Sequence, residues 1–214
     1  MLFAVGSPVL VEIEESLDRA GIVVAAGIRN RDCESYLSAP AMLVRSTAIP
    51  GNVKEFPFLI PLFTPGNRRQ AAEEAARLGF SHPFRLIDPT AIVPRHLDIG
   101  SGTYVNAGCT VGAKSTFGAF VFVNRGAGIG HHAKIGDFSS IGPGATIAGQ
   151  VTIGEGYMIG AGATILPGIT IGDGAVAAAG SVVTHDLPAG CLAMGNPARV
   201  VRHGIGGAQG LSAA

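Results

Sequence analysis

Large apolar residues return at every sixth position over nearly half of the chain, from Ile87 to Val183. The register never slips, and among these positions only Ala177 is small. A period of six matches neither the 3.6-residue α-helix nor the alternation of a half-exposed strand. It is the signature of a parallel β-helix, in which each six-residue unit forms a short strand and a turn. Three units complete one coil, so the pattern predicts that Val105, Val123 and Ile141 stack.

The residues between the apolar positions fit the same coil. Gly often follows the apolar residue, and a small residue such as Ala127, Ala145 or Ala163 stands four positions after it. We expect the apolar and the small residue to share the interior, while Gly relieves crowding at the corner. A run of β-hairpins is the alternative, but one insertion or deletion would break the register, and none occurs.

Residues 1–82 lack this period. The expected strands cover residues 2–6, 22–28 and 56–63, and the expected helices cover 9–21 and 64–80. Pro57 and Pro61 weaken the third strand, because proline cannot donate to a β-ladder. The alternation of strands and helices implies a small parallel α/β unit. Residues 33–51 are expected to form a loop with at most one short strand.

After Val183 the period breaks. Pro188, Gly190, Gly195 and Pro197 indicate a loop that leaves the β-helix, followed by a short strand or helix over residues 198–203. Residues 204–214 are rich in Gly and Ala, which predicts a flexible tail.

Composition narrows the possible partners. The 214 residues carry no net charge, only 14% are charged, and no basic block occurs, so we expect neither nucleic acid nor a membrane as partner. No apolar run is long enough to span a membrane, and the N-terminus lacks the basic start of a signal peptide. Cys33, Cys109 and Cys191 form neither a disulfide framework nor a metal-ligand spacing, which fits a reducing cytoplasm.

Two places carry candidate chemistry. His131 and His132 stand on a turn where other outward residues are mostly Gly, Ala, Ser, Thr and Asp. A neutral imidazole is the usual general base near neutral pH, and a solvated corner histidine is the alternative. Gly6, Ser7 and Pro8 join the first expected strand to the first helix, where free N–H groups often bind phosphate. Pro8 removes one donor and no G-x-G-x-x-G is present, so a plain tight turn also stays open.

Four segments carry a resemblance to a known family. They are VNRGAGIGHH at 123–132, IGDFSSIGPGATIAG at 135–149, ILPGITIGDGAVAAAGSVVTHDLPAG at 165–190 and MGNPARVVR at 194–202. With them the chain resembles the left-handed β-helix sugar acetyltransferases, the group of sialic acid O-acetyltransferases and bacterial N-acetyltransferases of UDP-4-amino sugars and perosamine. The resemblance implies a Rossmann-like βαβαβ domain over residues 1–82 that holds a sugar or nucleotide-sugar. It also implies a left-handed β-helix acyltransferase domain with a C-terminal extension over residues 83–203.

The resemblance also implies an activity. Acetyl-CoA would donate its acetyl group to an amino or hydroxyl group of a sugar, with His131 as general base and direct attack on the thioester. The family usually has Glu or Asp after this histidine, whereas this chain has His132, which cannot act as an anion. Asp137 could substitute, although Gly-Asp pairs are common in such repeats. The departure leaves open a weaker base, an orienting group from a neighbouring subunit, or a different acceptor.

Further site residues follow from the same resemblance. In the family, acetyl-CoA lies in the groove between two β-helices of a homotrimer. The matching positions here are Ser140, Gly149, Ala161 and Ala179, with Arg199 and Arg202 as candidates for its phosphates. The acceptor sugar is expected at Gly6, Ser7 and Pro8. An acidic pair often follows the second strand in the family, but here Arg29–Asn30–Arg31–Asp32 does, and its arginines favour a phosphate. No metal is expected.

Two other functions stay open. A zinc-dependent lyase of the γ-carbonic-anhydrase type uses the same β-helix but needs three histidine ligands. Only His131 and His132 lie well inside the repeat. A non-catalytic trimeric scaffold or regulator is the second alternative, because the usual acid after His131 is missing.

Overall fold

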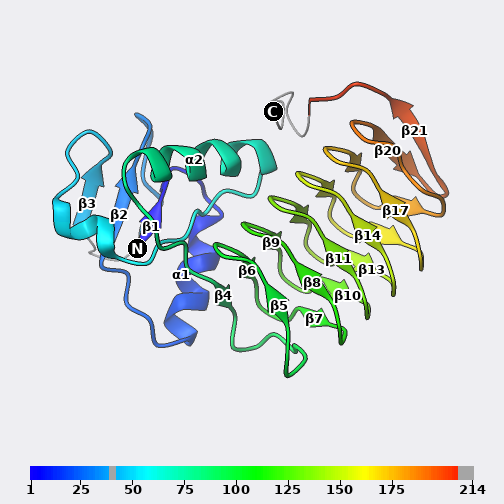
Figure 1. The fold of residues 1–214 in the computed structure, drawn as a ribbon, viewed down its shortest axis with the longest axis horizontal. Coiled ribbons are helices and arrows are strands. Elements are labelled where there is room, and N and C mark those ends of the chain that lie inside the picture. The colour runs from blue at the N-terminus through cyan, green and yellow to red at the C-terminus, as the bar shows by residue number, and fades with distance from the viewer. Residues whose placement is uncertain (39–41, 207–214) are drawn as a thin grey trace.

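The structure is a computed structural model that describes residues 1–38 and 42–206. A small α/β segment is followed by a left-handed parallel β-helix, as the sequence predicted (Figure 1). The coils run from β4, beside the α/β segment, to β21 at the opposite end of the molecule (Figure 1). None of the helices in the described ranges is long and apolar enough to cross a membrane.

The α/β segment is built on a parallel sheet in the order β1 (Leu2–Phe3), β2 (Ala26–Arg29), β3 (Met42–Arg45). Parallel bridges from Leu59 to Leu2 and from Phe58 to Pro83 extend the sheet on the other side of β1. The strand order therefore reverses beside β1. This is the doubly wound arrangement, whose ligands bind beyond the carboxyl ends of the strands at the point of reversal.

The helices of this segment are α1 (Leu10–Arg19), α2 (Pro65–Arg77) and the short 3-10 helix η1 (Gly51–Glu55). α1 and α2 fall within their predicted ranges. The predicted strand over 56–63 is reduced to isolated bridges, because Pro57 and Pro61 have no N–H to donate. β2 begins later than the predicted residue 22, because the Ile22 N–H instead caps α1 by donating to the carbonyl of Leu17 (2.8 Å).

The β-helix consists of two-residue strands in three parallel sheets. The strands are β4 (Leu86–Ile87), β5 (Asp98–Ile99), β6 (Tyr104–Val105), β7 (Thr110–Val111), β8 (Thr116–Phe117), β9 (Phe122–Val123), β10 (Gly128–Ile129), β11 (Lys134–Ile135), β12 (Ser140–Ile141), β13 (Thr146–Ile147), β14 (Thr152–Ile153), β15 (Met158–Ile159), β16 (Thr164–Ile165), β17 (Thr170–Ile171), β18 (Val176–Ala177) and β19 (Val182–Val183). Successive coils pair in the predicted register, as Ile141 does with Ile159.

The predicted interior positions form the core. The apolar positions from Ile99 to Val183 are at most 9% exposed. Two serines at the small interior position donate their hydroxyls to main-chain carbonyls, Ser115 to Gly130 and Ser139 to Gly154 (2.8 Å each). Burying one aliphatic side chain contributes about 1.5–3 kcal/mol, so the stacked columns are the main source of stability.

The C-terminal end differs from its prediction. Residues 192–202 stay on the coils, because β20 (Leu192–Gly195) pairs in parallel with β18 and antiparallel with β21 (Ala198–Arg202). Cys191 and Ala193 are fully buried and continue the interior of the coil, which explains why the chain does not leave it. The Asn196–Pro197 peptide between the two strands is cis. Residues 207–214 of the predicted flexible tail lie outside the described residues.

One buried arginine fixes α2 on the β-helix. Arg68 is 1% exposed, and burial lowers its pKa to about 9, which leaves the guanidinium charged at neutral pH. It donates six hydrogen bonds of 2.6–3.1 Å to uncharged acceptors. These are the carbonyl oxygens of Leu62, Phe63, Phe120, Phe138 and Ser139 and the hydroxyl of Ser140. Because the acceptors come from both segments, Arg68 holds the α/β segment against the coils.

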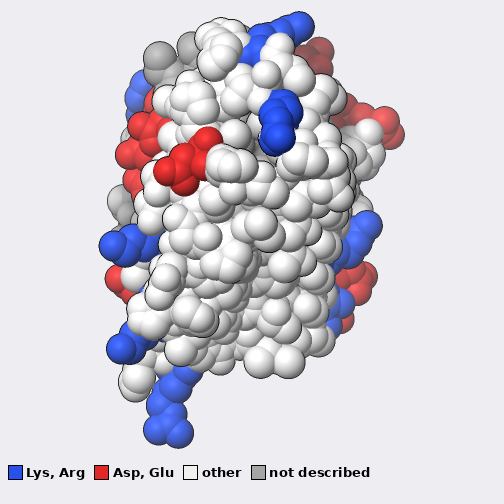
Figure 2. Space-filling model, turned by 90° about the vertical axis from the view of Figure 1, so that its right-hand side faces the viewer, with Lys and Arg blue, Asp and Glu red and all other residues white. Residues whose placement is uncertain are grey.

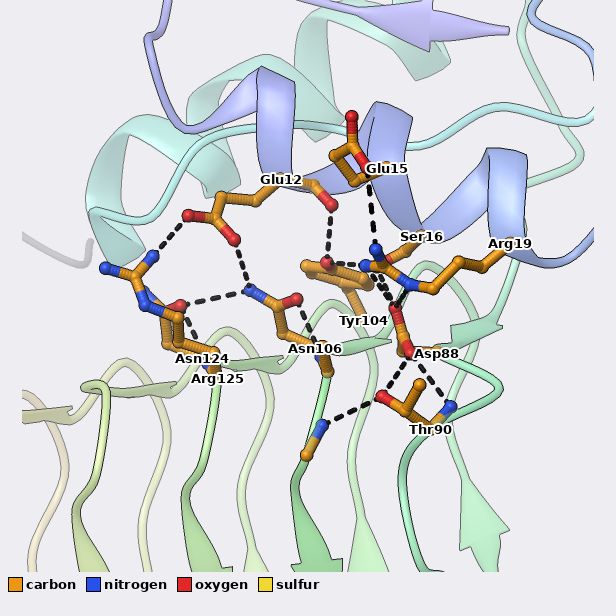
Figure 3. A network of polar contacts seen from close by, with 12 residues as sticks. Glu12, Glu15, Ser16, Arg19, Asp88, Thr90, Tyr104, Asn106, Asn124 and Arg125 are labelled. Atoms are coloured by element: carbon orange, nitrogen blue, oxygen red, sulfur yellow. Dashed lines mark hydrogen bonds and ion pairs between the residues drawn. The ribbon is translucent and has the colours of Figure 1, made fainter.

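A second contact joins α1 to the first coils (Figure 3). Asp88 is fully buried and accepts hydrogen bonds from Ser16 (2.6 Å), Arg19 (2.7 and 2.9 Å) and Thr90 (2.6 and 2.9 Å). Burial alone would raise the pKa of Asp88, but the hydrogen bonds from Arg19, Ser16 and Thr90 hold it well below its usual value. Tyr104 extends the network, with its hydroxyl 2.7 Å from that of Ser16.

Candidate functional site

The two candidate histidines form the turn between β10 and β11, and both side chains are exposed. The turn is held by both neighbouring coils. The His132 N–H donates to the carbonyl of Ala113 (3.0 Å), and the Gln150 N–H donates to the carbonyl of His131 (2.8 Å). The positive φ of His132 (58°) completes a tight turn at a position that most turns of the β-helix give to Gly. The backbone therefore fixes the positions from which both histidine side chains project.

The two imidazole rings contact each other. Their Nδ1 atoms are 2.9 Å apart, and the rings are perpendicular. At this distance one proton lies between two neutral imidazoles, so one ring donates and the other accepts. When His131 donates from Nδ1, its Nε2 carries the free lone pair and can act as a base. His132 thus stands at the place of the acid that the sequence lacks.

Gly149 lies against the His131 ring, one coil later. A Cβ atom on Gly149 would lie 2.8 Å from both Nε2 and Cε1 of His131. No larger residue fits there unless the ring moves. The absence of a side chain therefore leaves the Nε2 edge of the imidazole beside the Gly149 backbone.

The Gly149 N–H has no acceptor among the described residues. At two of the equivalent turn positions, the N–H groups of Ala119 and Glu155 donate to the carboxylates of Asp137 and Asp173 (2.8 Å each). The Asp137 carboxylate is thus bound to the turn of the preceding coil and not to the histidine pair. A free N–H beside a basic nitrogen can stabilise a developing negative oxygen while the base takes a proton.

The other predicted cofactor residues do not converge on this turn within one chain. Ser140 is fully buried, where it accepts a hydrogen bond from Arg68 (2.9 Å) and donates to the carbonyl of Phe63. This placement does not fit a contact between its side chain and a cofactor. Ala161 and Ala179 are exposed but follow β15 and β18, which belong to a different sheet from β10 and β13. Arg199 is exposed on β21.

Gly6, Ser7 and Pro8 border a cavity of about 380 Å³ at the carboxyl ends of β1 and β2. It lies beside the reversal of strand order, where doubly wound sheets bind their ligands. Other polar lining comes from Asn30, Arg31, Thr64 and Asn67. The predicted acceptor residues are therefore brought together in one pocket.

Close packing explains the glycine of this turn. A Cβ atom on Gly6 would lie 2.2 Å from the Cys33 sulfur. Sequence reasoning missed Asn30, Thr64 and Asn67 as lining residues. The signal that could have found them is their position, because residues that follow a strand or begin the next helix gather at the carboxyl edge of a parallel sheet.

In the part of the chain that the structure describes, no group of three or more His, Cys, Asp or Glu side chains is placed to hold a metal ion.

Comparison with known proteins gives sequence and structural matches. Residues 150–185 match the family model described as "Hexapeptide repeat of succinyl-transferase". No curated protein matches the chain. A mutant of perosamine N-acetyltransferase from Caulobacter crescentus, in complex with CoA and GDP-perosamine, is 30% identical, with a TM-score of 0.86 over 94% of this chain and 96% of that one. The acetyltransferase domain of PglB from Neisseria gonorrhoeae FA1090, in complex with acetyl coenzyme A, is 30% identical, with a TM-score of 0.81 over 94% and 97%. WeeI from Acinetobacter baumannii AYE shares the fold at 21% identity, with a TM-score of 0.80 over 94% and 98%.

Proposed function

The chain belongs to the hexapeptide-repeat family of left-handed β-helix sugar acetyltransferases, and we propose that its substrate is a nucleotide-linked amino sugar. As a member of this family it is an acyltransferase that uses acetyl-CoA. The bound CoA and GDP-perosamine of the Caulobacter relative support an amine on a nucleotide-linked sugar as the acceptor. A sugar hydroxyl is the alternative acceptor, and the reaction would serve the synthesis of surface polysaccharide.

In the proposed mechanism the sugar amine attacks the thioester directly. The amine nitrogen bonds to the carbonyl carbon while Nε2 of His131 takes the proton that the nitrogen loses. The carbon–sulfur bond then breaks, and His131 returns the proton to the departing CoA sulfur. His132 accepts the Nδ1–H of His131 throughout, which keeps Nε2 free for the incoming proton. No covalent enzyme intermediate is needed.

One observation carries the proposal: the Nε2 edge of His131 lies against Gly149, whose N–H has no acceptor among the described residues. The carbonyl oxygen of the thioester becomes negative during the attack. A backbone N–H that needs no reorganisation stabilises such an oxygen, and removing one such donor costs an enzyme about 10²–10³-fold in rate. Base and donor therefore meet at one point of the coil.

We propose that the complete site forms between subunits of a homotrimer. Ala161, Ala179 and Arg199 lie away from His131 in one chain but can face it from a neighbouring β-helix. Figure 2 shows a broad face without Lys, Arg, Asp or Glu on the side of the later coils, with charged side chains along its margins. Such a face can lie close to another coil without burying charge. Acetyl-CoA would occupy the groove between the two coils.

The acceptor would bind in the cavity at Gly6, Ser7 and Pro8. The guanidinium of Arg31 in the lining can pair with a phosphate there, and Asn30 and Asn67 offer both donors and acceptors to a sugar or nucleoside. The CoA-dependent reaction and the free thiols of Cys33, Cys109 and Cys191 support a cytoplasmic location.

A thiol-release assay tests this function. The protein is incubated with acetyl-CoA and UDP-, GDP- or dTDP-linked 4-amino sugars, and the sugar product is identified by mass spectrometry. The same sugars with the amine replaced by a hydroxyl serve as controls. We expect CoA release coupled to N-acetylation of at least one amino sugar. Release that does not exceed acetyl-CoA hydrolysis without a sugar, for every acceptor, would contradict the proposal.

A further inference from the structure

A second cavity adjoins the proposed acceptor pocket and has three arginines in its lining. It has a volume of about 130 Å³ and lies at the carboxyl ends of β2 and β3, with Arg29, Arg31, Arg45 and Asp32 in its lining. Asn30 and Arg31 line both cavities. A ligand in the larger cavity can therefore extend into the smaller one.

None of the three arginines forms an ion pair among the described residues. Arg29 and Arg45 are register partners on neighbouring strands, where like charges repel. Arg29 donates to the carbonyl of Cys33 and Arg31 to the side chain of Gln70 (3.3 Å each). Arg45 has no acceptor among the described residues, so its whole guanidinium is available to a ligand.

The position of the smaller cavity relative to the sheet indicates that it would hold the nucleoside part of a nucleotide. In a doubly wound sheet, a ligand whose phosphates lie at the turn after the first strand places its ribose and base at the end of the second strand. The larger cavity lies at the turn after β1, and the smaller one lies at the ends of β2 and β3. A nucleotide in the larger cavity thus directs its nucleoside toward the arginines.

The lining chemistry distinguishes the bases. A guanidinium donates two parallel hydrogen bonds, and a carboxylate accepts two. Guanine presents two adjacent acceptors, O6 and N7, to the guanidinium. It presents two adjacent N–H donors to the carboxylate. In uracil and thymine an N–H separates the two carbonyls, and adenine places an amino group beside N7. Cytosine offers adjacent acceptors but only one donor group to the carboxylate.

Resting on the proposed function, we propose that the arginine cavity selects guanine and that the acceptor is a guanosine diphosphate sugar. Arg45 donates to O6 and N7, while Asp32 accepts from the other edge of the base.

Calorimetric titration of the full-length protein with GDP, UDP, dTDP and CDP tests the selectivity without any need for turnover. We expect GDP to bind at least about 10-fold more tightly than the other three, since one bidentate pair discriminates by about that factor or more. Arg45→Gln should remove this preference by weakening GDP binding, with little effect on UDP. Arg77→Gln, an exposed arginine at the end of α2, is the matched control.

Arg45→Lys separates guanine recognition from simple attraction of charge. Lysine keeps the positive charge but not the planar fork. We expect this variant to lose selectivity for GDP, provided that its thermal unfolding matches wild type. Retained selectivity in Arg45→Lys, or equal wild-type affinity for another nucleotide, would overturn the inference. Efficient acetylation of a UDP- or dTDP-linked sugar would overturn it too, yet leave the proposed function intact. GDP selectivity without acetyl transfer would contradict the proposed function and leave the guanine inference intact.

Discussion

Gly149→Ala separates catalysis from folding in this protein. The new Cβ atom would lie 2.8 Å from Nε2 and Cε1 of His131, whereas ordinary contacts begin at 3.4 Å. The ring must therefore move by at least about 0.6 Å, and a displacement near 1 Å in a catalytic group can cost about 10² in rate. Gly149 is not among the glycines with positive φ, so alanine adds no backbone strain.

The same geometry predicts little loss of stability. The atoms that the new methyl group meets belong to an exposed, rotatable side chain, so we expect the free energy of unfolding to change by no more than about 0.5 kcal/mol. The assay compares kcat/KM with the urea unfolding curve. Gly128→Ala, on the coil of His131, is the matched control, because its Cβ would meet only the Thr110 hydroxyl at 3.6 Å. A Gly149→Ala enzyme as active as Gly128→Ala would refute the placement of the reaction beside His131.

Three further variants test other parts of the account. Arg68→Met should lower the free energy of unfolding by about 3–5 kcal/mol in urea denaturation, because it leaves buried carbonyls unpaired. Arg69→Met, which removes an exposed ion pair, should cost less than about 1 kcal/mol, and equal losses would contradict the role given to Arg68. The lowered pKa of Asp88 contributes stability that is present above about pH 4 and is lost as the pH falls further. Acid unfolding of Asp88→Asn should therefore depend less on pH than that of wild type, and identical slopes would count against the network. His132→Phe should lower kcat by roughly 10-fold and leave the KM for acetyl-CoA unchanged, because the Nδ1–H of His131 loses its acceptor, whereas His132→Glu should restore kcat. Wild-type kcat in His132→Phe would show that His132 does not position the base.

The β-helix and its register follow from the sequence because its contacts repeat. Each interior residue packs against residues one coil away, so the period that orders the strands also orders the core. The contact between His131 and Gly149 is of this kind. Both residues occupy the same turn position in successive coils, and the stacking rule places them together.

Contacts between the two segments do not repeat, and sequence reasoning could not place them. Ser140 stands on a strand position that faces outward in other coils, yet Arg68 from α2 covers it. Neither the sequence around Ser140 nor the sequence around Arg68 indicates that these two side chains meet. Arg45 lies in residues 33–51, which were expected to form a loop with at most one short strand. Its position opposite Arg29 therefore follows only from the register of β2 and β3.

The central claim is that His131 is the general base of an acetyl transfer from acetyl-CoA. The most direct test is the steady-state rate of N-acetylation of the best nucleotide-linked amino sugar by His131→Asn. His96→Asn, an exposed histidine near the start of the repeat, is the control. We predict that kcat/KM falls by about 10²–10⁴-fold in His131→Asn while acetyl-CoA affinity and thermal unfolding stay at wild-type values. A His131→Asn enzyme with the kcat/KM of the His96→Asn control would contradict the account.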